Sequence, residues 1–348
     1  MIRQCVDYAA LLRNAVPKID VRAPAEYGRG AFDEAVNLPL LNDDERRQIG
    51  IRYRQAGQRS AIELGEALVS GTVREQRVAA WVEFANTHPD AVIYCWRGGL
   101  RSEIVQRWMS DAGAGLPRVT GGFRALRTFC LGVLQRFVSE RRLLVLAGRT
   151  GSGKTALLRE LSCTLDLEHL ANHRGSAFGA HASPQPTPIH FENCLAAAML
   201  RIADGRVVVV EDESRTIGRL AIPQALYDAM RTAPVVVLEA PVAERVERIL
   251  AEYVLDPLAQ GIPAATLAAR YLDSLHRIRR RLGGLRHREV VGLVTCAFET
   301  HDASLHRRWI ERLLRWYYDP MYDYQTEGKK QRIVFRGARD DVRSHIEQ

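Results

Sequence analysis

The segment at residues 148–155, which reads Gly-Arg-Thr-Gly-Ser-Gly-Lys-Thr, constrains the fold of this chain more than any other. It fits the pattern G-x-x-x-x-G-K-S/T and lies between an apolar run at 143–147 and a predicted helix at 156–161. In such a strand–loop–helix unit, backbone N–H groups turn inward around a phosphate and the helix N-terminus adds positive charge. The segment therefore predicts a phosphate-binding loop in a parallel-sheet domain.

The same pattern assigns roles to single residues. Lys154 is expected to reach a terminal phosphate, and Thr155 to ligate Mg²⁺ if the reaction uses a metal. The other phosphate-binding residues predicted in the loop are Gly148, Gly151, Ser152 and Gly153. The loop recognises a diphosphate and reads no base, so the group that carries the diphosphate stays open.

A run of acids follows the next apolar segment. Residues 207–210 predict a second buried strand, and Glu-Asp-Glu-Ser-Arg comes directly after it at 211–215. A carboxylate at this point is the usual partner of a metal ion or a reacting water, but three adjacent positions compete for that role. The candidate ligand contacts in this half of the chain are His173, Arg174, Ser176, Glu211, Glu213 and Arg215.

A second strand–loop–helix pattern surrounds Cys95. The apolar run 91–95 leads into Cys-Trp-Arg-Gly-Gly-Leu-Arg-Ser, and a helix is predicted at 103–109. Loop amides and a helix N-terminus lower a cysteine pKa below its usual value of about 8.5, and two glycines let the backbone curl around an anion. We predict a reactive thiolate or oxyanion site outside the hydrophobic core. Its catalytic residues are Cys95, Arg97 and Arg101, and its anion-binding glycines are Gly98 and Gly99.

Short apolar runs alternate with helix-like segments through most of the 348 residues, which predicts an α/β fold with two domains. We place the boundary near 139–142, so that residues 1–138 form one domain and 139–348 the other. The predicted strands outside the two loops are 17–21 and 235–238, and the predicted helices of the first domain include 60–86 and 126–137. After about residue 241 the pattern is mainly helical and basic.

Composition excludes several classes of protein. No run approaches the roughly 18 apolar residues that a membrane helix needs, and the N-terminus lacks the apolar core of a signal peptide. The six cysteines form no C-x-x-C pair, which argues against zinc, and a 39 kDa chain needs no disulfides. We therefore expect a cytoplasmic enzyme without membrane contact.

The net charge of +8 favours an anionic partner. Residues 276–336 hold 14 Lys or Arg against 7 Asp or Glu, so much of the surplus lies in one stretch. Trp309 and Trp316 stand at helical spacing from Leu313, which favours a core position for both. The residues predicted to contact RNA are Arg277, Arg279, Arg280, Arg281, Arg286 and Arg288.

Further motifs carry a family resemblance. Residues 19–27 (Ile-Asp-Val-Arg-Ala-Pro-Ala-Glu-Tyr) and 35–39 (Ala-Val-Asn-Leu-Pro), with the Cys95 loop, resemble the rhodanese homology domain, a sulfurtransferase fold. That resemblance implies a structural pairing of Asp20 with Arg22. Together with the phosphate loop, four more blocks make nearly the whole chain similar to the tRNA 2-selenouridine synthases. They are 121–125 (Gly-Gly-Phe-Arg-Ala), 173–179 (His-Arg-Gly-Ser-Ala-Phe-Gly), 211–218 (Glu-Asp-Glu-Ser-Arg-Thr-Ile-Gly) and 317–325 (Tyr-Tyr-Asp-Pro-Met-Tyr-Asp-Tyr-Gln).

The resemblance implies a transferase that acts on tRNA carrying 2-thiouridine at the wobble position. Geranyl diphosphate alkylates the sulfur, and selenium from selenophosphate then replaces the geranylthio group. A separate enzyme supplies the selenophosphate, no cofactor is tightly bound, and Mg²⁺ is an optional partner of Thr155. Cys95 then carries selenium, assists as a thiolate or shapes the anion pocket. Leu100 stands where the family pattern leads us to expect Met.

Three other functions fit parts of the sequence. The phosphate loop alone suits an ATP-dependent kinase or NTPase with an accessory rhodanese domain. The spacing from Cys95 to Arg101 suits a cysteine phosphatase, although Tyr94 stands where such enzymes often have His. An RNA-binding protein with a vestigial rhodanese module is the non-enzymatic alternative, and two intact loops argue against it.

Overall fold

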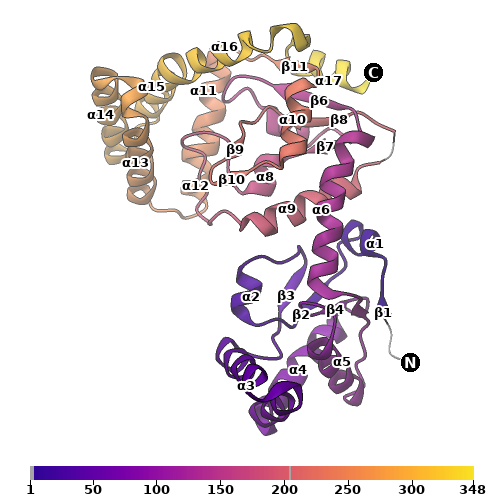
Figure 1. The fold of residues 1–348 in the computed structure, drawn as a ribbon. Helices are drawn as coiled ribbons and strands as arrows, with labels where there is room; N and C mark the ends of the chain where they lie inside the picture. Colours follow the sequence, from indigo (N-terminus) through magenta and orange to yellow (C-terminus); the bar gives the residue numbers. More distant parts are fainter. Residues whose placement is uncertain (1–3, 204) are drawn as a thin grey trace. The chain divides into compact units, whose positions relative to one another are not determined.

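The computed structural model describes residues 4–203 and 205–348, which divide into two compact units (Figure 1). Unit 1 consists of Met1–Phe137 and Pro186–Arg201, and unit 2 of Val138–Gln185 and Ile202–Gln348. The boundary expected from the sequence assigned residues 186–201 to the second domain. By its contacts, helix α9 (Pro188–Arg201) belongs to unit 1, where Asn193 donates to the carbonyl of Ala31 and Arg127 pairs with Glu192.

Unit 1 is built on a five-stranded sheet in which every neighbouring pair is parallel. The strand order is β1 (Gln4–Cys5), β5 (Arg118–Val119), β4 (Val92–Tyr94), β2 (Lys18–Asp20), β3 (Ala35–Asn37). The strands β2 and β4 are fully buried, which agrees with the continuous apolar runs that predicted them. Its other helices are α1 (Tyr8–Arg13), α2 (Pro24–Gly28), α3 (Asp43–Leu68), α4 (Gly71–Thr87), α5 (Leu100–Asp111) and α6 (Gly122–Glu140).

The helical region 60–86 differs from the prediction of one continuous helix. The structure has two helices here, because α3 ends at Leu68 and α4 begins at Gly71. Gly71 has a φ of +51°, a conformation that the preceding helix cannot continue through. The predicted pairing of Asp20 with Arg22 is confirmed: the two side chains are 1% exposed or less and lie 2.6 Å apart.

Unit 2 contains a second parallel sheet, ordered β12 (Ile333–Gly337), β11 (Val235–Leu238), β6 (Leu143–Ala147), β8 (Val208–Glu211), β7 (Thr164–Leu165). The central strands β6, β8 and β11 are the ones predicted from apolar runs. Strand β12 was not expected, since the region after residue 241 seemed wholly helical. The unit also holds α7 (Lys154–Leu158), α8 (Leu167–Ala171), α10 (Gln224–Thr232), α17 (Arg339–Glu347) and a hairpin of β9 (Thr216–Ile217) with β10 (Leu220–Ala221).

A helical subdomain follows β11 and gathers to one side of the unit 2 sheet (Figure 1). It consists of α11 (Val242–Leu250), α12 (Asp256–Ala259), α13 (Ala264–Leu282), α14 (Gly284–Thr300), α15 (Ala303–Leu313) and α16 (Asp319–Glu327), with π-helical turns η1 (Ala251–Leu255) and η2 (Leu314–Tyr318). Trp309 is buried in its core and Trp316 packs against that core, as predicted. None of the described helices combines the length and apolarity needed to cross a lipid bilayer.

Candidate active site

The phosphate loop connects the end of β6 to the start of α7 in unit 2, and a cavity of about 720 Å³ opens above it. This volume is typical of small-molecule sites. The cavity brings together many of the residues predicted from sequence. Those that line it are Gly148, Gly151, Gly153, Lys154, Thr155, Arg174, Ser176, Glu213 and Arg281.

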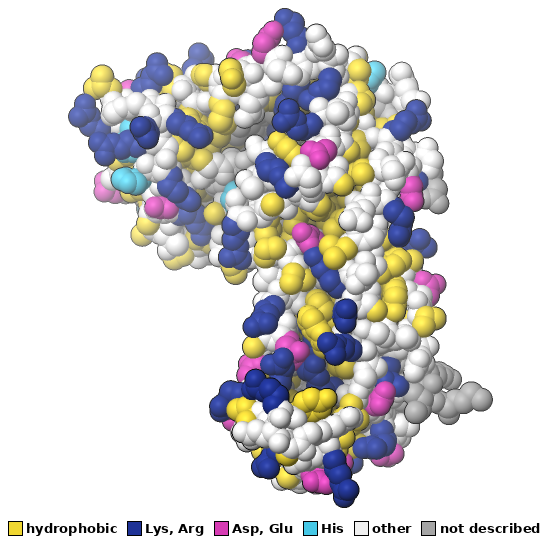
Figure 2. All heavy atoms as spheres, in the orientation of Figure 1, with side chains coloured by type: hydrophobic (Ala, Val, Ile, Leu, Met, Phe, Trp, Pro, Cys, Tyr) yellow, Lys and Arg dark blue, Asp and Glu magenta, His cyan; other side chains and the backbone are white. Residues whose placement is uncertain are grey.

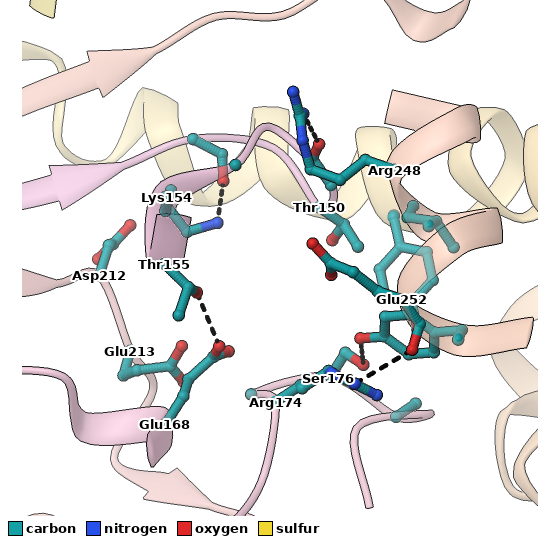
Figure 3. A pocket seen from close by; sticks show the side chains of 18 of the residues that line it. Thr150, Lys154, Thr155, Glu168, Arg174, Ser176, Asp212, Glu213, Arg248 and Glu252 are labelled. Atoms are coloured by element: carbon teal, nitrogen blue, oxygen red, sulfur yellow. Dashed lines mark hydrogen bonds between the residues drawn. The ribbon is translucent and has the colours of Figure 1, made fainter. Parts of the chain in front are cut away.

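Lys154 and Thr155 lie on one side of the cavity, facing Arg248 and Glu252 across the open space (Figure 3). The Nζ atom of Lys154 donates to the carbonyl of Gly148 at 2.9 Å. A phosphate oxygen is a charged and therefore stronger acceptor than a backbone carbonyl. The lysine is thus held where an incoming phosphate could take over its hydrogen bond.

Two glutamates contact the Thr155 hydroxyl, and a third, Glu213, interacts with one of them, Glu168. Thr155 Oγ1 lies 3.1 Å from Oε1 of Glu211 and 3.3 Å from Oε2 of Glu168. Burial, with the charge of Glu168 added, raises the pKa of Glu211 to about 8, and burial also raises the pKa of Glu168 and Glu213. Acids this close together and largely withdrawn from water repel one another when ionised, so the cluster favours a bound proton or cation.

The three adjacent acids of residues 211–213 have different partners. Glu211 is 1% exposed and contacts Thr155, while Glu213 lines the cavity. Asp212 binds Lys329, with both carboxylate oxygens 2.5 Å from the ammonium. Of the three acids between which the sequence could not decide, Glu211 is the one that lies beside Thr155.

The opposite wall is formed by the segment 173–179 and by η1. Arg174 donates to the carbonyl of Glu252 at 3.1 Å, and its guanidinium lies 4.6 Å from the ring centre of Tyr253. The hydroxyls of Ser176 and Tyr253 are 3.3 Å apart. A Cβ on Gly175 would stand 2.4 Å from the carboxylate of Glu213, so glycine is required where this segment approaches the acids.

Four predicted contacts do not line the cavity, and one of them, Glu211, is the buried acid beside Thr155 described above. Arg215 donates to the carbonyl of Ile222 and lies over the ring of Tyr227, so it braces the β9–β10 hairpin. His173 is half-buried, and its Nδ1 has no hydrogen-bond partner within residues 4–203 and 205–348. Ser152 is 4% exposed and packs inside the loop.

The Cys95 loop of unit 1 is closed. Cys95 is 3% exposed and packs in the hydrophobic core of unit 1 with Ile19 and Val105. Its sulfur lies 3.3 Å from Oγ of Ser102 and 3.8 Å from the carbonyl oxygen of Gly99. The expectation that this thiol lies outside the core is wrong, because Cys95 directly continues the buried strand β4 and the loop folds over it.

The two arginines of this loop have different environments. Arg97 is exposed, whereas Arg101 donates to both carboxylate oxygens of Glu26, at 2.6 and 3.2 Å. Burial pushes the pKa of Glu26 upward, but the hydrogen bond and charge of Arg101 outweigh it and the net pKa is lowered. A cysteine phosphatase needs that arginine for its substrate. The ion pair with Glu26 therefore disfavours the phosphatase alternative.

The motif 121–125 packs against the backbone of the Cys95 loop and hydrogen-bonds to it. Gly98 and Gly122 have φ values of +66° and +59° and touch each other. A Cβ on Gly122 would lie 2.4 Å from the nitrogen of Gly98, so neither position has room for a side chain. Phe123 and Arg124 also donate their backbone N–H groups to the carbonyls of Cys95 and Trp96. These contacts fix the loop without using its own amides.

The six arginines predicted to contact RNA are all exposed on α13 and α14. Figure 2 shows Lys and Arg side chains gathered where Figure 1 places these helices. Arg281 also lines the cavity, and Arg286 lies over the ring of Trp316 at 5.4 Å. The basic surface of unit 2 is therefore continuous with the rim of its phosphate-loop cavity.

Comparison with known proteins identifies the family. Residues 141–348 match the domain described as "tRNA 2-selenouridine synthase AAA domain". The chain is 49% identical to the tRNA 2-selenouridine synthase of Pseudomonas syringae pv. tomato, covering 98% of this chain and 97% of that protein. The corresponding protein of Bordetella petrii is 48% identical, with 98% and 95% covered. The chain belongs to the tRNA 2-selenouridine synthase family.

A solved structure also matches, described as "N-terminal domain of putative ATP/GTP binding protein from Clostridium difficile 630". It is 33% identical and covers 33% of this chain and 89% of that one, with a TM-score of 0.32. A score this low carries no argument about the fold. The family assignment rests on the tRNA 2-selenouridine synthases alone.

Several cavity residues of this tRNA 2-selenouridine synthase family member were not predicted from sequence. Glu168 follows the short strand β7, a position where a carboxylate at a strand end could have been noticed. Arg248 donates to the carbonyl of Gly151 from α11, and no local pattern marks it. The π-helical turns η1 and η2 bring Tyr253 and Tyr318 to the cavity wall; Tyr318 belongs to the family block 317–325, for which no role in the cavity was predicted. Such turns often occur at functional sites, but sequence gives no signal for them.

Among the residues that the structure describes, one other group of side chains could hold a metal ion. Asp33, His190 and Cys194, all in unit 1, each offer a ligand atom within 4.8 Å of the others. In the absence of a metal, burial raises the pKa of the Cys194 thiol to about 12.

Proposed function

We propose that this protein converts 2-thiouridine at the wobble position of tRNA into 2-selenouridine by two successive group transfers. The observation that carries the proposal is the unit 2 cavity, in which a phosphate loop and an acidic cluster face a tyrosine-rich wall. A prenyl diphosphate consists of an anionic diphosphate, which would bind the phosphate loop, and an apolar chain, which would contact the tyrosine-rich wall. Membership of the tRNA 2-selenouridine synthase family supports the choice of tRNA as acceptor.

In the first step the thiocarbonyl sulfur forms a bond to C1 of geranyl diphosphate. The bond between C1 and the phosphate oxygen breaks, diphosphate leaves with the electron pair, and the base loses its N3 proton to solvent. Lys154 and the loop amides would stabilise the negative charge that develops on the leaving diphosphate. S-alkylation turns a poor leaving group on the base into a good one.

Mg²⁺ would fit beside the phosphate loop. Thr155 Oγ1 and Glu211 Oε1 lie 3.1 Å apart and offer the oxygen ligands that this ion prefers. A cation there would relieve the repulsion among Glu168, Glu211 and Glu213. It would supply charge neutralisation for the leaving diphosphate, while Lys154 and the loop amides bind and orient that group.

In the second step we assign selenophosphate to unit 1, as a rhodanese-like domain with Cys95 at the end of its central strand β4. Selenium attacks C2 of the base, the C–S bond breaks with geranylthiolate as leaving group, and water cleaves the Se–P bond to release phosphate. The five-stranded parallel sheet and the loop amides around Cys95 support this assignment. Because the thiol is buried, the loop must open if Cys95 is to contact selenium directly. A separate selenophosphate-producing enzyme supplies the donor.

The exposed arginines of α13 and α14 are proposed to bind the tRNA backbone. Arg279 and Arg280 are exposed and lie next to Arg281 at the cavity rim. Replacing both by alanine should weaken tRNA binding roughly tenfold and reduce its salt dependence. Mobility-shift titrations at several salt concentrations measure this, with Arg52 and Arg54 on α3, also exposed, replaced as the control. An equal loss in the control would mean that only net charge matters.

A mass-spectrometric assay tests the first step. The protein is incubated with thiolated tRNA and geranyl diphosphate, with and without Mg²⁺, and the digested nucleosides are searched for the S-geranyl adduct. Selenophosphate is then added, and the mass of 2-selenouridine is followed. ATP hydrolysis without any prenyl adduct would instead support the kinase or NTPase alternative.

A further inference from the structure

The unit 2 cavity has two chemically different halves. One half carries the phosphate loop, the glutamates and Arg174. The other half is formed by Ile249 and by aromatic and thioether side chains from η1, η2 and α16. The apolar residues of this second half are Ile249, Tyr253, Tyr317, Tyr318 and Met321. Such a wall is unnecessary for binding diphosphate, so it points to an apolar group attached to the diphosphate.

A second, smaller cavity lies directly behind the apolar wall. It has a volume of about 20 Å³ and shares Thr150, Ser176, Ile249, Tyr253 and Tyr318 with the large cavity. Its remaining lining is entirely apolar and buried, and consists of Phe178, Trp309, Ile310, Leu313 and Leu314. A space of this size admits about one small group, so it would form the end of an apolar channel and not a separate site.

The apolar wall begins at the phosphate loop itself. The Cδ1 atom of Ile249 lies 2.8 Å from where a Cβ on Gly151 would stand, so this side chain packs against the loop backbone. Thr150, also in the loop, borders both cavities. A diphosphate held by the loop would therefore direct an attached chain along Ile249 toward Tyr253 and Tyr318.

We propose that this wall binds the hydrocarbon chain of the prenyl donor, and that Ile310 and Leu314 at the back of the small cavity limit its length. The inference rests on the proposed function and adds a substrate-selecting subsite to it. Each buried methylene contributes about 0.8 kcal/mol, so two isoprene units gain substantial affinity along the wall. A longer chain would collide with Ile310 and Leu314, which are each 1% exposed and packed in the core.

Chain selectivity gives the first test. Wild-type protein and a Leu314→Ala variant are offered dimethylallyl, geranyl and farnesyl diphosphates in competition, and the prenylated nucleosides are counted by mass. Wild type should favour geranyl, and the variant should shift toward farnesyl by roughly tenfold or more. Leu275→Ala is the matched control, because Leu275 is fully buried in the same core and lines neither cavity.

Binding to the separate halves of the donor gives the second test, which holds even if Leu314→Ala does not fold. Met321→Ala, which alters the wall at a residue outside the phosphate loop and its packing partner Ile249, should weaken binding of geranyl diphosphate roughly tenfold and leave binding of inorganic diphosphate unchanged. Isothermal titration with the two ligands, and with ATP, measures this. An equal loss for both diphosphates, or a loss confined to ATP, would contradict the proposal that this wall binds the hydrocarbon chain.

The outcomes separate the two levels of the proposal. If wild type forms no prenylated nucleoside with any donor, the proposed function fails and the subsite fails with it. If wild type geranylates tRNA but Leu314→Ala keeps the wild-type donor preference, the length limit is wrong and the proposed function stands. A shift toward farnesyl in Leu275→Ala as well would attribute the change to a loosened core, and would also overturn the length limit.

Discussion

The Cys95 loop and the phosphate loop begin from the same sequence pattern, an apolar strand followed by glycines, a basic residue and a helix. In the folded molecule they differ in charge balance. The Cys95 loop is internally satisfied, since Arg101 is paired with Glu26 and the thiol is buried beside Ser102. The phosphate loop carries unrelieved repulsion, because the buried Glu211 and the partly buried Glu168 and Glu213 lie near its threonine and an open cavity.

Two acids show this contrast directly. The pKa of Glu26, beside the Cys95 loop, is lowered on balance by Arg101, while burial raises the pKa of Glu211, beside the phosphate loop, to about 8. Charge repulsion that no side chain of the protein neutralises is typical of sites that bind a ligand or an ion. The comparison teaches that the phosphate loop is ready to bind, whereas the Cys95 loop must rearrange before it can react.

The largest expected effect comes from removing the charge of the open loop. If the proposed first step is right, Lys154→Ala should lower geranylation of thiolated tRNA by at least about 100-fold, because Lys154 is the residue we assign to the charge of the leaving diphosphate. The adduct mass measures the rate, and titration with geranyl diphosphate measures affinity. Lys330→Ala, which removes a lysine that is exposed on the surface, is the control. Normal geranylation by the Lys154→Ala variant would show that the phosphate loop does not bind the donor through this lysine.

Cys95→Ala tests the closed loop. We expect it to lose 2-selenouridine formation by roughly 100-fold while geranylation stays normal, because we assign the thiol to the proposed second step alone. Cys130→Ala is the matched control, since Cys130 is a fully buried thiol of the same unit outside the loop. Both nucleoside masses are measured in one reaction series. Selenouridine formation at the full rate in Cys95→Ala would show that the loop needs no thiol.

The sequence predicted the elements that depend on local pattern. Strand β6 has the same ends as the apolar run 143–147, and the phosphate loop follows it as expected. Strand β12 was missed because its residues alternate between partly buried and exposed at the edge of the sheet, unlike the continuous apolar runs of β6, β8 and β11. The helical pattern of the residues before and after it was stronger than its own strand pattern.

The parts of the site that could not be predicted depend on contacts between distant residues. Arg101 and Glu26 are 75 positions apart, so the motif around Cys95 predicted a free arginine where the fold supplies a partner. The composition of residues 96–101 describes the loop and gives no information on how deeply Cys95 itself lies. The π-helical turns that carry Tyr253 and Tyr318 likewise have no sequence signature.

The stability of a Glu26→Gln variant tests whether the Glu26–Arg101 ion pair stabilises the Cys95 loop. The substitution should lower the free energy of unfolding by about 2 kcal/mol at pH 7, because the buried Glu26 side chain loses the charge that pairs with the partly buried guanidinium of Arg101. Folding lowers the pKa of Glu26, so its contribution is complete above the unfolded value of about 4.3 and is lost as the pH falls through the folded value. Denaturant unfolding of the two proteins should therefore converge in acid. A difference that persists there would assign the loss to packing.

Glu211 should show the opposite pH dependence, with the smallest effect. Folding raises its pKa from about 4.5 to about 8, so the native state binds the extra proton and stability falls as the pH rises through this window. Without Mg²⁺, the melting temperature should drop by roughly 3–5 °C between pH 5 and 8, and Glu211→Gln should flatten the curve. Mg²⁺ should restore wild type at pH 8 and leave the variant unchanged, since the cation replaces the proton at an ionised carboxylate. A wild-type melting temperature that rises over this window would mean that the phosphate-loop acids are as well satisfied as Glu26, and the contrast between the two loops would disappear.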